Sequence, residues 1–245
     1  SMEIGADYIA TGHYARIKKL DNGRYTVQKS VTVAKDQTYA LYNLTQDQLS
    51  KTLMPVGEYN KTQIRQIAAD IGIQVANKPD SQDICFVPDG DYAGYLEREE
   101  GLKAVPGNFV DMNGKVLGTH KGIIHYTIGQ RKGLGLAMGH PVFVVDIIPE
   151  TNEVVIGENA DTFSKELIAD KTNFMSVEHP EDGMQVIGKI RYAHKGVPCK
   201  IYMLDDARVR VVFDEPVRAA TKGQAVVFYE NDYIVGGGTI KEIIR

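Results

Sequence analysis

The sequence lacks the features that mark membrane-spanning and secreted proteins. Its 245 residues contain no apolar run approaching the ~18 residues that suggest a membrane span. The opening segment, SMEIGADYIATGHYARI, has no basic region followed by an apolar region, so it does not resemble a secretory signal. Two cysteines are too few for a disulfide framework. These absences predict a water-soluble, cytoplasmic protein without membrane contact, whose thiols are reduced at rest.

An excess of positive charge and the common ligand-binding motifs are also missing. The formal net charge of -4 argues against a protein that coats nucleic acid through bulk charge, so any RNA contact must use a local basic surface. The sequence has no glycine-rich phosphate loop, no Cys-x-x-Cys pair and no histidines at metal-ligand spacing. We therefore expect no metal site.

The first ninety residues contain both strand and helix signals. Residues 8–10 predict a strand, and residues 14–33 predict a hairpin in which Asn22-Gly23 supplies the positive φ angles of a tight turn. Thr45 begins a capping-box pattern, followed by an apolar stripe of Leu49 and Leu53 that stops at Pro55. Asn60 can cap a second helix that ends at Gly72, with Ile64, Ile67, Ala68 and Ile71 on one face.

After about residue 90 the pattern becomes alternating, which predicts an all-β second half. Turn signals at Asn113-Gly114, Thr151-Asn152, Asp205-Asp206 and Asn231-Asp232 separate runs such as VFVVDII, ARVRVVF and QAVVFYE. The polar and poorly alternating stretch NADTFSKELIADKT is the expected joint between a middle β region and a C-terminal β-barrel.

The two cysteines have different surroundings. Cys85 follows the polar loop NKPDS, so it is either a small buried hydrophobe, as most lone cysteines are, or a reactive thiolate at a loop. Cys199 alternates with Val197, Ile201 and Met203 on one face of an expected strand, which predicts a core position.

Two short polar groups and two basic clusters are further candidate sites. Thr11-Gly12-His13 follows an expected strand, where a glycine permits close approach of a ligand to the backbone. Lys35-Asp36-Gln37 precedes TYALY and is either a solvated turn or a binding group. The segments THKGIIHYTIGQRKGLG and GKIRYAHKGVPCK mix basic residues with glycines and tyrosines, which suits phosphate contact and base stacking but is also typical of charged outer strands.

Taken in order, several of these segments resemble one known family, the tRNA-specific 2-thiouridylases, bacterial enzymes that thiolate the wobble uridine of tRNA. The resemblance rests on ADYIATGHYAR, KDQTYALY, SQDICFV, HYTIGQRKGLG, KIRYAH, VVFDEPVRAATKGQAVVFY and GGGTI. The resemblance runs from about residue 5 to the C-terminus. Several distinctive motifs in a fixed order indicate a family more specifically than any single motif does.

The resemblance implies an α+β multidomain fold. Residues 1–91 would form the C-terminal part of the α/β nucleotide-binding catalytic domain, residues 92–160 a small central β domain, and residues 161–245 a C-terminal antiparallel β-barrel. The family's N-terminal part, with its SGG-x-DS pyrophosphate loop and first catalytic cysteine, is absent from this sequence. We therefore expect that segment to be a partner, and expect the 245-residue chain alone to bind ATP poorly.

The resemblance also implies a chemistry and a set of site residues. The family adenylates the C2 oxygen of uridine with ATP, with Mg²⁺ as the expected companion ion, and then attacks C2 with sulfur. Cys85 would carry the persulfide received from a sulfur-relay protein, and the other catalytic cysteine would release the thiolated base and leave a disulfide. Gly12 would contact the nucleotide. The implied tRNA contacts are His13, Lys35, Asp36, Gln37, Arg191, Tyr192 and Gln224.

Two rival interpretations remain open from the residues alone. One is a non-catalytic RNA-binding β-barrel module, which needs no thiol. The other is a cysteine hydrolase in which His13 serves Cys85 as the base. Alkylation of Cys85 discriminates these hypotheses. An RNA-binding module would still bind RNA, and a hydrolase would lose its esterase activity. A thiouridylase fragment would show no esterase activity before or after alkylation.

Overall fold

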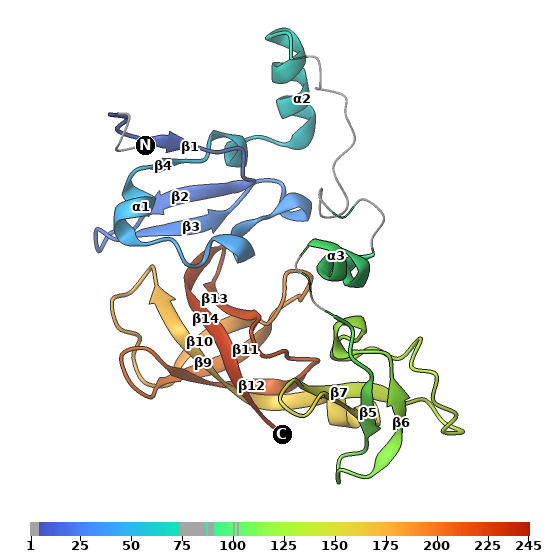
Figure 1. The fold of residues 1–245 in the computed structure, drawn as a ribbon. Coiled ribbons are helices and arrows are strands. Elements are labelled where there is room, and N and C mark those ends of the chain that lie inside the picture. The colour runs from blue at the N-terminus through green and yellow to red at the C-terminus, as the bar shows by residue number, and fades with distance from the viewer. Residues whose placement is uncertain (1–4, 74–86, 88–90, 100, 102) are drawn as a thin grey trace. The chain divides into compact units, whose positions relative to one another are not determined.

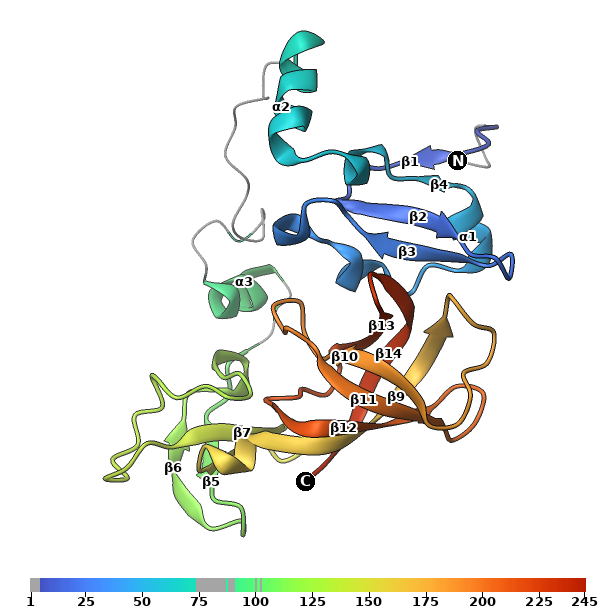
Figure 2. The same cartoon turned by 180° about the vertical axis from the view of Figure 1, so that it is seen from behind.

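The computed structural model describes residues 5–73, 87, 91–99, 101 and 103–245. Cys85 and the polar loop before it lie outside these described residues. The chain divides into two compact units, the first made of residues 1–77, 165–217 and 221–244, and the second of residues 78–164, 218–220 and 245. Figures 1 and 2 label the elements of both units. The expected division into three domains stays a prediction.

The first unit contains a closed β-barrel. Its six strands follow the order β13-β10-β11-β12-β9-β14, and β14 pairs back onto β13, so the sheet has no open edge between them. This closure confirms the C-terminal barrel expected from the alternating pattern. The strands are β9 (Phe163–Phe174), β10 (Met184–Lys189), β11 (Val197–Met203), β12 (Val209–Arg218), β13 (Ala225–Glu230) and β14 (Tyr233–Ile244).

Alternate residues of these strands fill the barrel. Ile201, Val211 and Phe213 are fully buried, and Cys199 is 2% exposed, which confirms its predicted core position. Residues 159–172 were expected to form a polar joint between two regions. Most of this stretch instead belongs to strand β9, in which Leu167 is fully buried. The boundary between the two compact units nevertheless falls inside that stretch, at residues 164 and 165.

A hairpin from the N-terminal region extends the barrel sheet. Strands β2 (Ala15–Lys19) and β3 (Tyr25–Lys29) pair antiparallel, and Gln28 of β3 lies opposite Tyr233 of β14. The hairpin confirms the prediction, but its turn differs, since Gly23 has φ +83° and Asn22 is not among the residues with positive φ. The Leu20 carbonyl accepts from Gly23, and the Leu20 amide donates to the Arg24 carbonyl, so the loop is longer than a two-residue turn.

Short elements precede and follow this hairpin. Strands β1 (Ile9–Ala10) and β4 (Thr52–Leu53) pair in parallel. The predicted capping box at Thr45 is confirmed at the start of α1 (Gln46–Ser50), and the predicted cap Asn60 precedes α2 (Lys61–Asp70), where it also forms a capping box with Gln63. Leu53 belongs to β4 and not to a helical stripe, and none of the α2 residues is buried. The described part of this region also contains the short 3-10 helices η2 (Val33–Lys35), η3 (Thr38–Leu41) and η4 (Pro55–Glu58).

The second unit contains a four-stranded sheet in the order β6-β5-β8-β7, in which β5 and β8 are parallel. Its core is built around Phe109, Val144 and Val154. Helix α3 (Tyr92–Glu99) was not predicted, because the sequence interpretation extended the alternating pattern over this segment. The other elements are β5 (Gly107–Val110), β6 (Val116–His120), η5 (Ile123–His125), β7 (Phe143–Ile148), β8 (Glu153–Gly157) and η6 (Ala160–Thr162).

The predicted turns separate the strands as expected. Gly114 and Asn152 take positive φ angles between the strands of the second unit, and Asn231 does so between β13 and β14. Among the helices of the described residues, none has the length and apolarity required to cross a bilayer.

Candidate nucleic-acid interface

The candidate interface lies in the first unit and combines two segments that are distant in sequence. Lys35 ends η2, Asp36 and Gln37 connect it to η3, and Arg191 with Tyr192 follows the end of β10. The Tyr192 hydroxyl donates a 2.8 Å hydrogen bond to the main-chain carbonyl of Asp36, across 156 residues of sequence. Two groups that the sequence named separately therefore share one surface.

The side chain of Asp36 is also held, by a hydrogen bond within its own segment. The Thr38 hydroxyl donates to Asp36 Oδ2 at 2.6 Å, which fixes the carboxylate against the start of η3. Thr38 is itself fully buried, and its hydroxyl also lies 3.1 Å from that of Tyr229 on β13. Asp36 Oδ1 is buried and has no hydrogen-bond partner among the described residues. A buried carboxylate oxygen in this state needs a donor or a nearby positive charge.

Gln37 ties this segment to the candidate glycine-histidine pair. Its side-chain Oε1 accepts from the Tyr14 amide at 2.8 Å, and its own amide donates to the Tyr14 carbonyl at 3.1 Å. One residue earlier, His13 Nδ1 lies 2.9 Å from the Thr11 hydroxyl. The reciprocal bonds fix the orientation of the Gln37 amide and connect His13, through the backbone, to the same part of the unit.

Tyr39 links the interface to the remaining candidate, Gln224. Its hydroxyl donates to the Ala225 carbonyl at 2.8 Å, directly after the exposed Gln224, and its ring meets that of Tyr192 edge to face at 6.3 Å. Burial raises the pKa of Tyr39 to about 12, so this hydroxyl stays protonated and remains a donor at neutral pH. The structure thus groups every candidate tRNA contact within the first unit.

Two further lysines belong to this surface: Lys189, which lies in the predicted basic segment GKIRYAHKGVPCK but was not among the implied tRNA contacts, and Lys29, which was not a sequence candidate. Lys189, the last residue of β10, places its ammonium 5.9 Å from the ring centroid of Tyr39 and 5.7 Å from that of Tyr229. Lys29 places its ammonium 5.1 Å from the Tyr229 centroid. Tyr39 follows the KDQ group within the word KDQTYALY, so proximity in sequence could have indicated it. No sequence signal connects Lys29 with β10, because their proximity depends on barrel closure.

The resulting surface joins cations with aromatic rings. Tyr192 is 54% exposed and stands beside Arg191, while the half-buried Lys189 lies next to both Tyr39 and Tyr229. Ammonium and guanidinium groups contact phosphate oxygens, and exposed tyrosine rings stack on unpaired bases. The arrangement can therefore bind a single-stranded or looped nucleic acid.

The other basic segment, around residues 119–135, is only partly exposed. His120 is 2% exposed, its Nδ1 accepts from the Gly122 amide at 3.0 Å, and its Nε2 lies 3.0 Å from the Asn152 carbonyl. Its ring also packs edge to face against Phe109 and Tyr126. The sequence interpretation of His120 as part of a phosphate-binding cluster is therefore wrong, because the side chain is a hydrogen-bonded member of the core.

Gly12 fits the role of a residue that a ligand approaches closely. It is exposed, and a Cβ built on it would meet no heavy atom within 4 Å, so the space beside its backbone is open. The open space is compatible with a nucleotide beside the carboxyl end of β1, as the resemblance implies.

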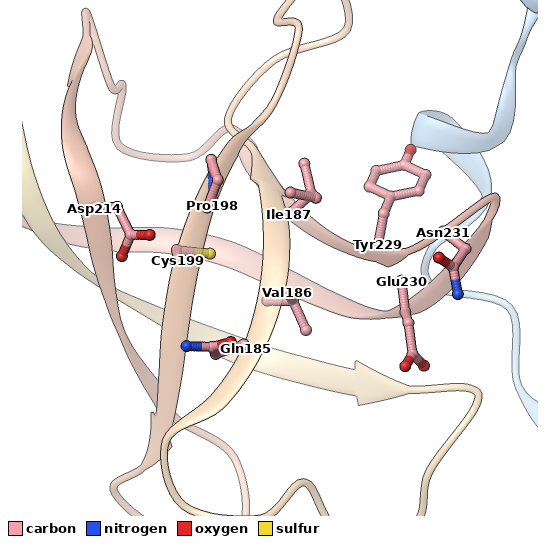
Figure 3. Close-up of a pocket in the computed structure, with 9 residues that line it drawn as sticks. All are labelled: Gln185, Val186, Ile187, Pro198, Cys199, Asp214, Tyr229, Glu230 and Asn231. Carbon is pink, nitrogen blue, oxygen red and sulfur yellow. The ribbon is translucent and has the colours of Figure 1, made fainter.

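The described cysteine occupies a different environment. Cys199 borders a hollow of about 250 Å³ on the barrel, and Figure 3 shows its sulfur directed from β11 towards β10. Burial, with a smaller effect from Asp214, raises the thiol pKa to about 12. A thiol with this pKa is protonated at neutral pH and is not a nucleophile. Cys199 is a free cysteine, and Cys85 lies outside the described residues.

Comparison with known proteins assigns domains to consecutive parts of the chain. The matching family descriptions are the tRNA methyl transferase HUP domain over residues 1–89, the tRNA methyl transferase PRC-barrel domain over residues 95–158, and the aminomethyltransferase beta-barrel domain over residues 164–240. These matches define a class of multidomain protein in which two of the three domains are named for tRNA modification.

Curated relatives identify the family more closely. The chain is 66% identical over 240 residues to the tRNA-specific 2-thiouridylase MnmA of Lachnoclostridium phytofermentans, and 54% identical over 241 residues to that of Clostridioides difficile. Each alignment covers 98% of this chain and 67% of the relative, so the chain spans about two thirds of their length. The chain belongs to the tRNA-specific 2-thiouridylase family.

Proposed function

We propose that this chain takes part in the ATP-dependent 2-thiolation of the wobble uridine of tRNA, and that the surface around Asp36 and Tyr192 binds the tRNA. The observation that carries the proposal is the hydrogen bond from Tyr192 to the Asp36 carbonyl, which unites two candidate tRNA-binding segments 156 residues apart. Membership of the 2-thiouridylase family supports the reaction, and the cation-aromatic composition of the surface supports the substrate.

The residues of this surface have separable roles in the proposal. Lys35 and Arg191 supply positive charge for phosphates, and the exposed ring of Tyr192 offers a stacking surface. Gln37 and His13 lie at the side near the end of β1, where the target base would enter the nucleotide site at Gly12. Gln224 contributes a polar contact at the edge of the barrel next to Tyr39.

In this proposal Cys85 carries the sulfur as a persulfide, which a sulfur-relay protein supplies. ATP, together with Mg²⁺, supplies the activation that converts the C2 oxygen of uridine into a leaving group. The terminal sulfur of the Cys85 persulfide forms a bond to C2 as the activated oxygen departs. A second cysteine thiolate then attacks the Cys85 sulfur, the sulfur–sulfur bond breaks, and its electron pair stays on the base as the thiocarbonyl. The two cysteines are left as a disulfide, which a cellular thiol reductant restores in the reducing cytoplasm.

The assay that tests the proposal transfers labelled sulfur from a persulfide donor to unmodified tRNA in the presence of ATP and Mg²⁺. It uses protein that contains this chain together with the remaining third of the relatives' length. Wild type and Cys199→Ser should form 2-thiouridine, whereas Cys85→Ser should form none, because a hydroxyl cannot hold the terminal sulfur.

Binding by the same three proteins separates the enzyme from a passive RNA module. All three should bind tRNA equally, because neither cysteine is among the proposed tRNA contacts. Robust 2-thiouridine formation by Cys85→Ser would refute the assigned thiol, and binding without any thiolation by wild type would favour the non-catalytic RNA-binding module.

A further inference from the structure

Lys189 occupies an unusual position for a lysine. It ends strand β10, it is half-buried, and its ammonium lies within 6 Å of the ring centroids of two tyrosines, Tyr39 and Tyr229. The rings attract the cation through their electron-rich faces, and they hold it in place at the edge of the candidate interface. Most lysines instead extend their ammonium into water, because burial costs solvation energy.

Positive charge is concentrated around this ammonium. Lys29 places its ammonium 5.1 Å from the same Tyr229 ring. Burial first, and then Lys29, lower the pKa of Lys189, and burial first, then Arg191 and Lys189, lower the pKa of His194. Asp36 is the carboxylate that favours the Lys189 charge. Cations that repel one another across a half-buried surface raise the energy of the unliganded protein, and an anion bound between them would lower it.

His194 adds a polar atom with unused hydrogen-bonding capacity. Its side chain is partly buried and hydrogen-bonds the backbone of Gly188, yet its Nδ1 is buried without a hydrogen-bond partner among the described residues. Protonation of this ring nitrogen when an anion is near adds a second positive charge beside the Lys189 ammonium. The loop that carries His194 is closed by the bond from its amide to the Arg191 carbonyl, so ring and guanidinium belong to one turn.

We infer that Lys189 and His194 form a binding site for one backbone phosphate of the bound tRNA, with Lys29 adding to the positive potential. The inference rests on the proposed function, because it assigns these residues to the same surface as Asp36, Arg191 and Tyr192. A lysine ammonium presents a point charge without a pattern matched to base edges, so the contact positions the RNA and is independent of its sequence.

A purely structural role and a phosphate-binding role for Lys189 predict different melting temperatures for Lys189→Met. If the cation-aromatic contacts served only to brace the barrel, Lys189→Met would lower the melting temperature. In a phosphate site the same substitution keeps the aliphatic stem between the tyrosines and removes a partly desolvated charge next to Lys29. Its melting temperature should therefore equal or exceed that of wild type, while RNA binding weakens.

The experiment measures equilibrium binding of unmodified tRNA between about 50 mM and about 200 mM salt for wild type, Lys189→Met, Arg191→Met and the control Lys241→Met. Lys241 is exposed on β14 and lies outside the candidate interface. At low salt Lys189→Met should bind about tenfold more weakly, as expected for one charge-assisted contact. Its logarithmic salt slope should fall by about 0.7 to 1. The loss should be equal for a tRNA of different sequence, and Lys241→Met should match wild type.

A second variant reports on the imidazole. Wild-type affinity should rise as the pH falls below neutral, because phosphate favours the imidazolium, whose pKa in the free protein is lowered by burial and by Arg191 and Lys189. His194→Gln should lose this rise while retaining binding at neutral pH.

The possible failures are distinguishable. If neither Arg191→Met nor Lys189→Met changes tRNA affinity, the proposed interface itself is wrong. If Arg191→Met weakens binding but Lys189→Met leaves affinity and salt slope unchanged, only the phosphate site is wrong. The third failure combines two results: Lys189→Met has a lowered melting temperature, and His194→Gln binds tRNA as wild type does at every pH. Together they would assign Lys189 and His194 a structural role.

Discussion

The hydroxyl of Tyr192 lies 2.8 Å from the main-chain carbonyl of Asp36, so the loop after β10 is joined to the segment between η2 and η3. The bond uses only the polar tip of Tyr192, and the ring, which is 54% exposed, stays available for contact. The Asp36 carboxylate accepts a separate hydrogen bond from Thr38. The link between the two segments therefore uses the main chain of Asp36 and leaves its side chain bound to Thr38.

Removal of this one bond should affect binding more than folding. In Tyr192→Phe the ring remains, but the two segments lose their link, and we expect tRNA affinity to fall by about fivefold, or about 1 kcal/mol. The melting temperature should change little, since the bond lies at the surface. Tyr202→Phe, a half-buried tyrosine of β11, is the control. Equal affinity of Tyr192→Phe and wild type would mean that the link does not position the interface.

The two cysteines should differ in reactivity. With a pKa of about 12, the buried Cys199 thiol should resist alkylation at neutral pH in the folded protein, whereas Cys85 should react. Peptide mapping after treatment with iodoacetamide measures both. Cys199→Ser should also lower the free energy of unfolding by about 1 to 3 kcal/mol, because a hydroxyl replaces a thiol in the core. Rapid alkylation of Cys199 in the native protein would contradict its assigned environment.

Two glycines should respond oppositely to alanine. A Cβ on Gly237 of β14 would meet Tyr42 Cδ2 at 2.6 Å and the Val226 carbonyl at 2.8 Å, so Gly237→Ala should cost about 1 to 3 kcal/mol of stability through overpacking. A Cβ on Gly12 would meet nothing within 4 Å. Gly12→Ala should therefore fold normally and fail only in the ATP-dependent step. Chemical denaturation and the sulfur-transfer assay test the pair, and a destabilised Gly12→Ala protein would argue against an open site there.

The stability of the protein should depend on His194 in mildly acidic solution. Burial first, and then Arg191 and Lys189, lower the pKa of His194 below the ordinary 6.5. Between the folded pKa and 6.5 the unfolded chain binds more protons, so this contribution to the free energy of unfolding falls as the pH decreases through that window. Denaturation curves of His194→Gln should show a shallower loss below 6.5. An identical pH dependence in both proteins would contradict the assigned shift.

Local features of the fold could be predicted from the sequence because they depend on neighbouring residues. Thr45 and Asn60 cap their helices through side chains three positions away, and Cys199 alternates with its strand neighbours, so short-range patterns were sufficient. The helix α3 was missed because its apolar positions are few. His120 was misassigned because no local pattern reveals that the Asn152 carbonyl and the Gly122 amide use both ring nitrogens.

The individual residues of the candidate site could be predicted from the sequence, but their proximity in the fold could not. The resemblance supplied Asp36 and Tyr192 as separate contacts, yet their bond depends on closure of the barrel and on the pairing of the β2–β3 hairpin with β14. The same closure brings Lys29 and Lys189 to one tyrosine ring. Such long-range proximity has no counterpart in spacing, which explains why the cationic group around Tyr229 emerged only from the structure.

Protection of lysines from acetylation by bound tRNA provides the sharpest test of the proposed interface, because it uses the wild-type protein and measures each lysine by mass spectrometry. We expect unmodified tRNA to protect Lys35 and Lys189, while the exposed Lys165 and Lys241 react as in the free protein. Protection should disappear at high salt together with binding. Saturating tRNA that left Lys35 and Lys189 fully reactive, while protecting other lysines, would contradict the proposed interface.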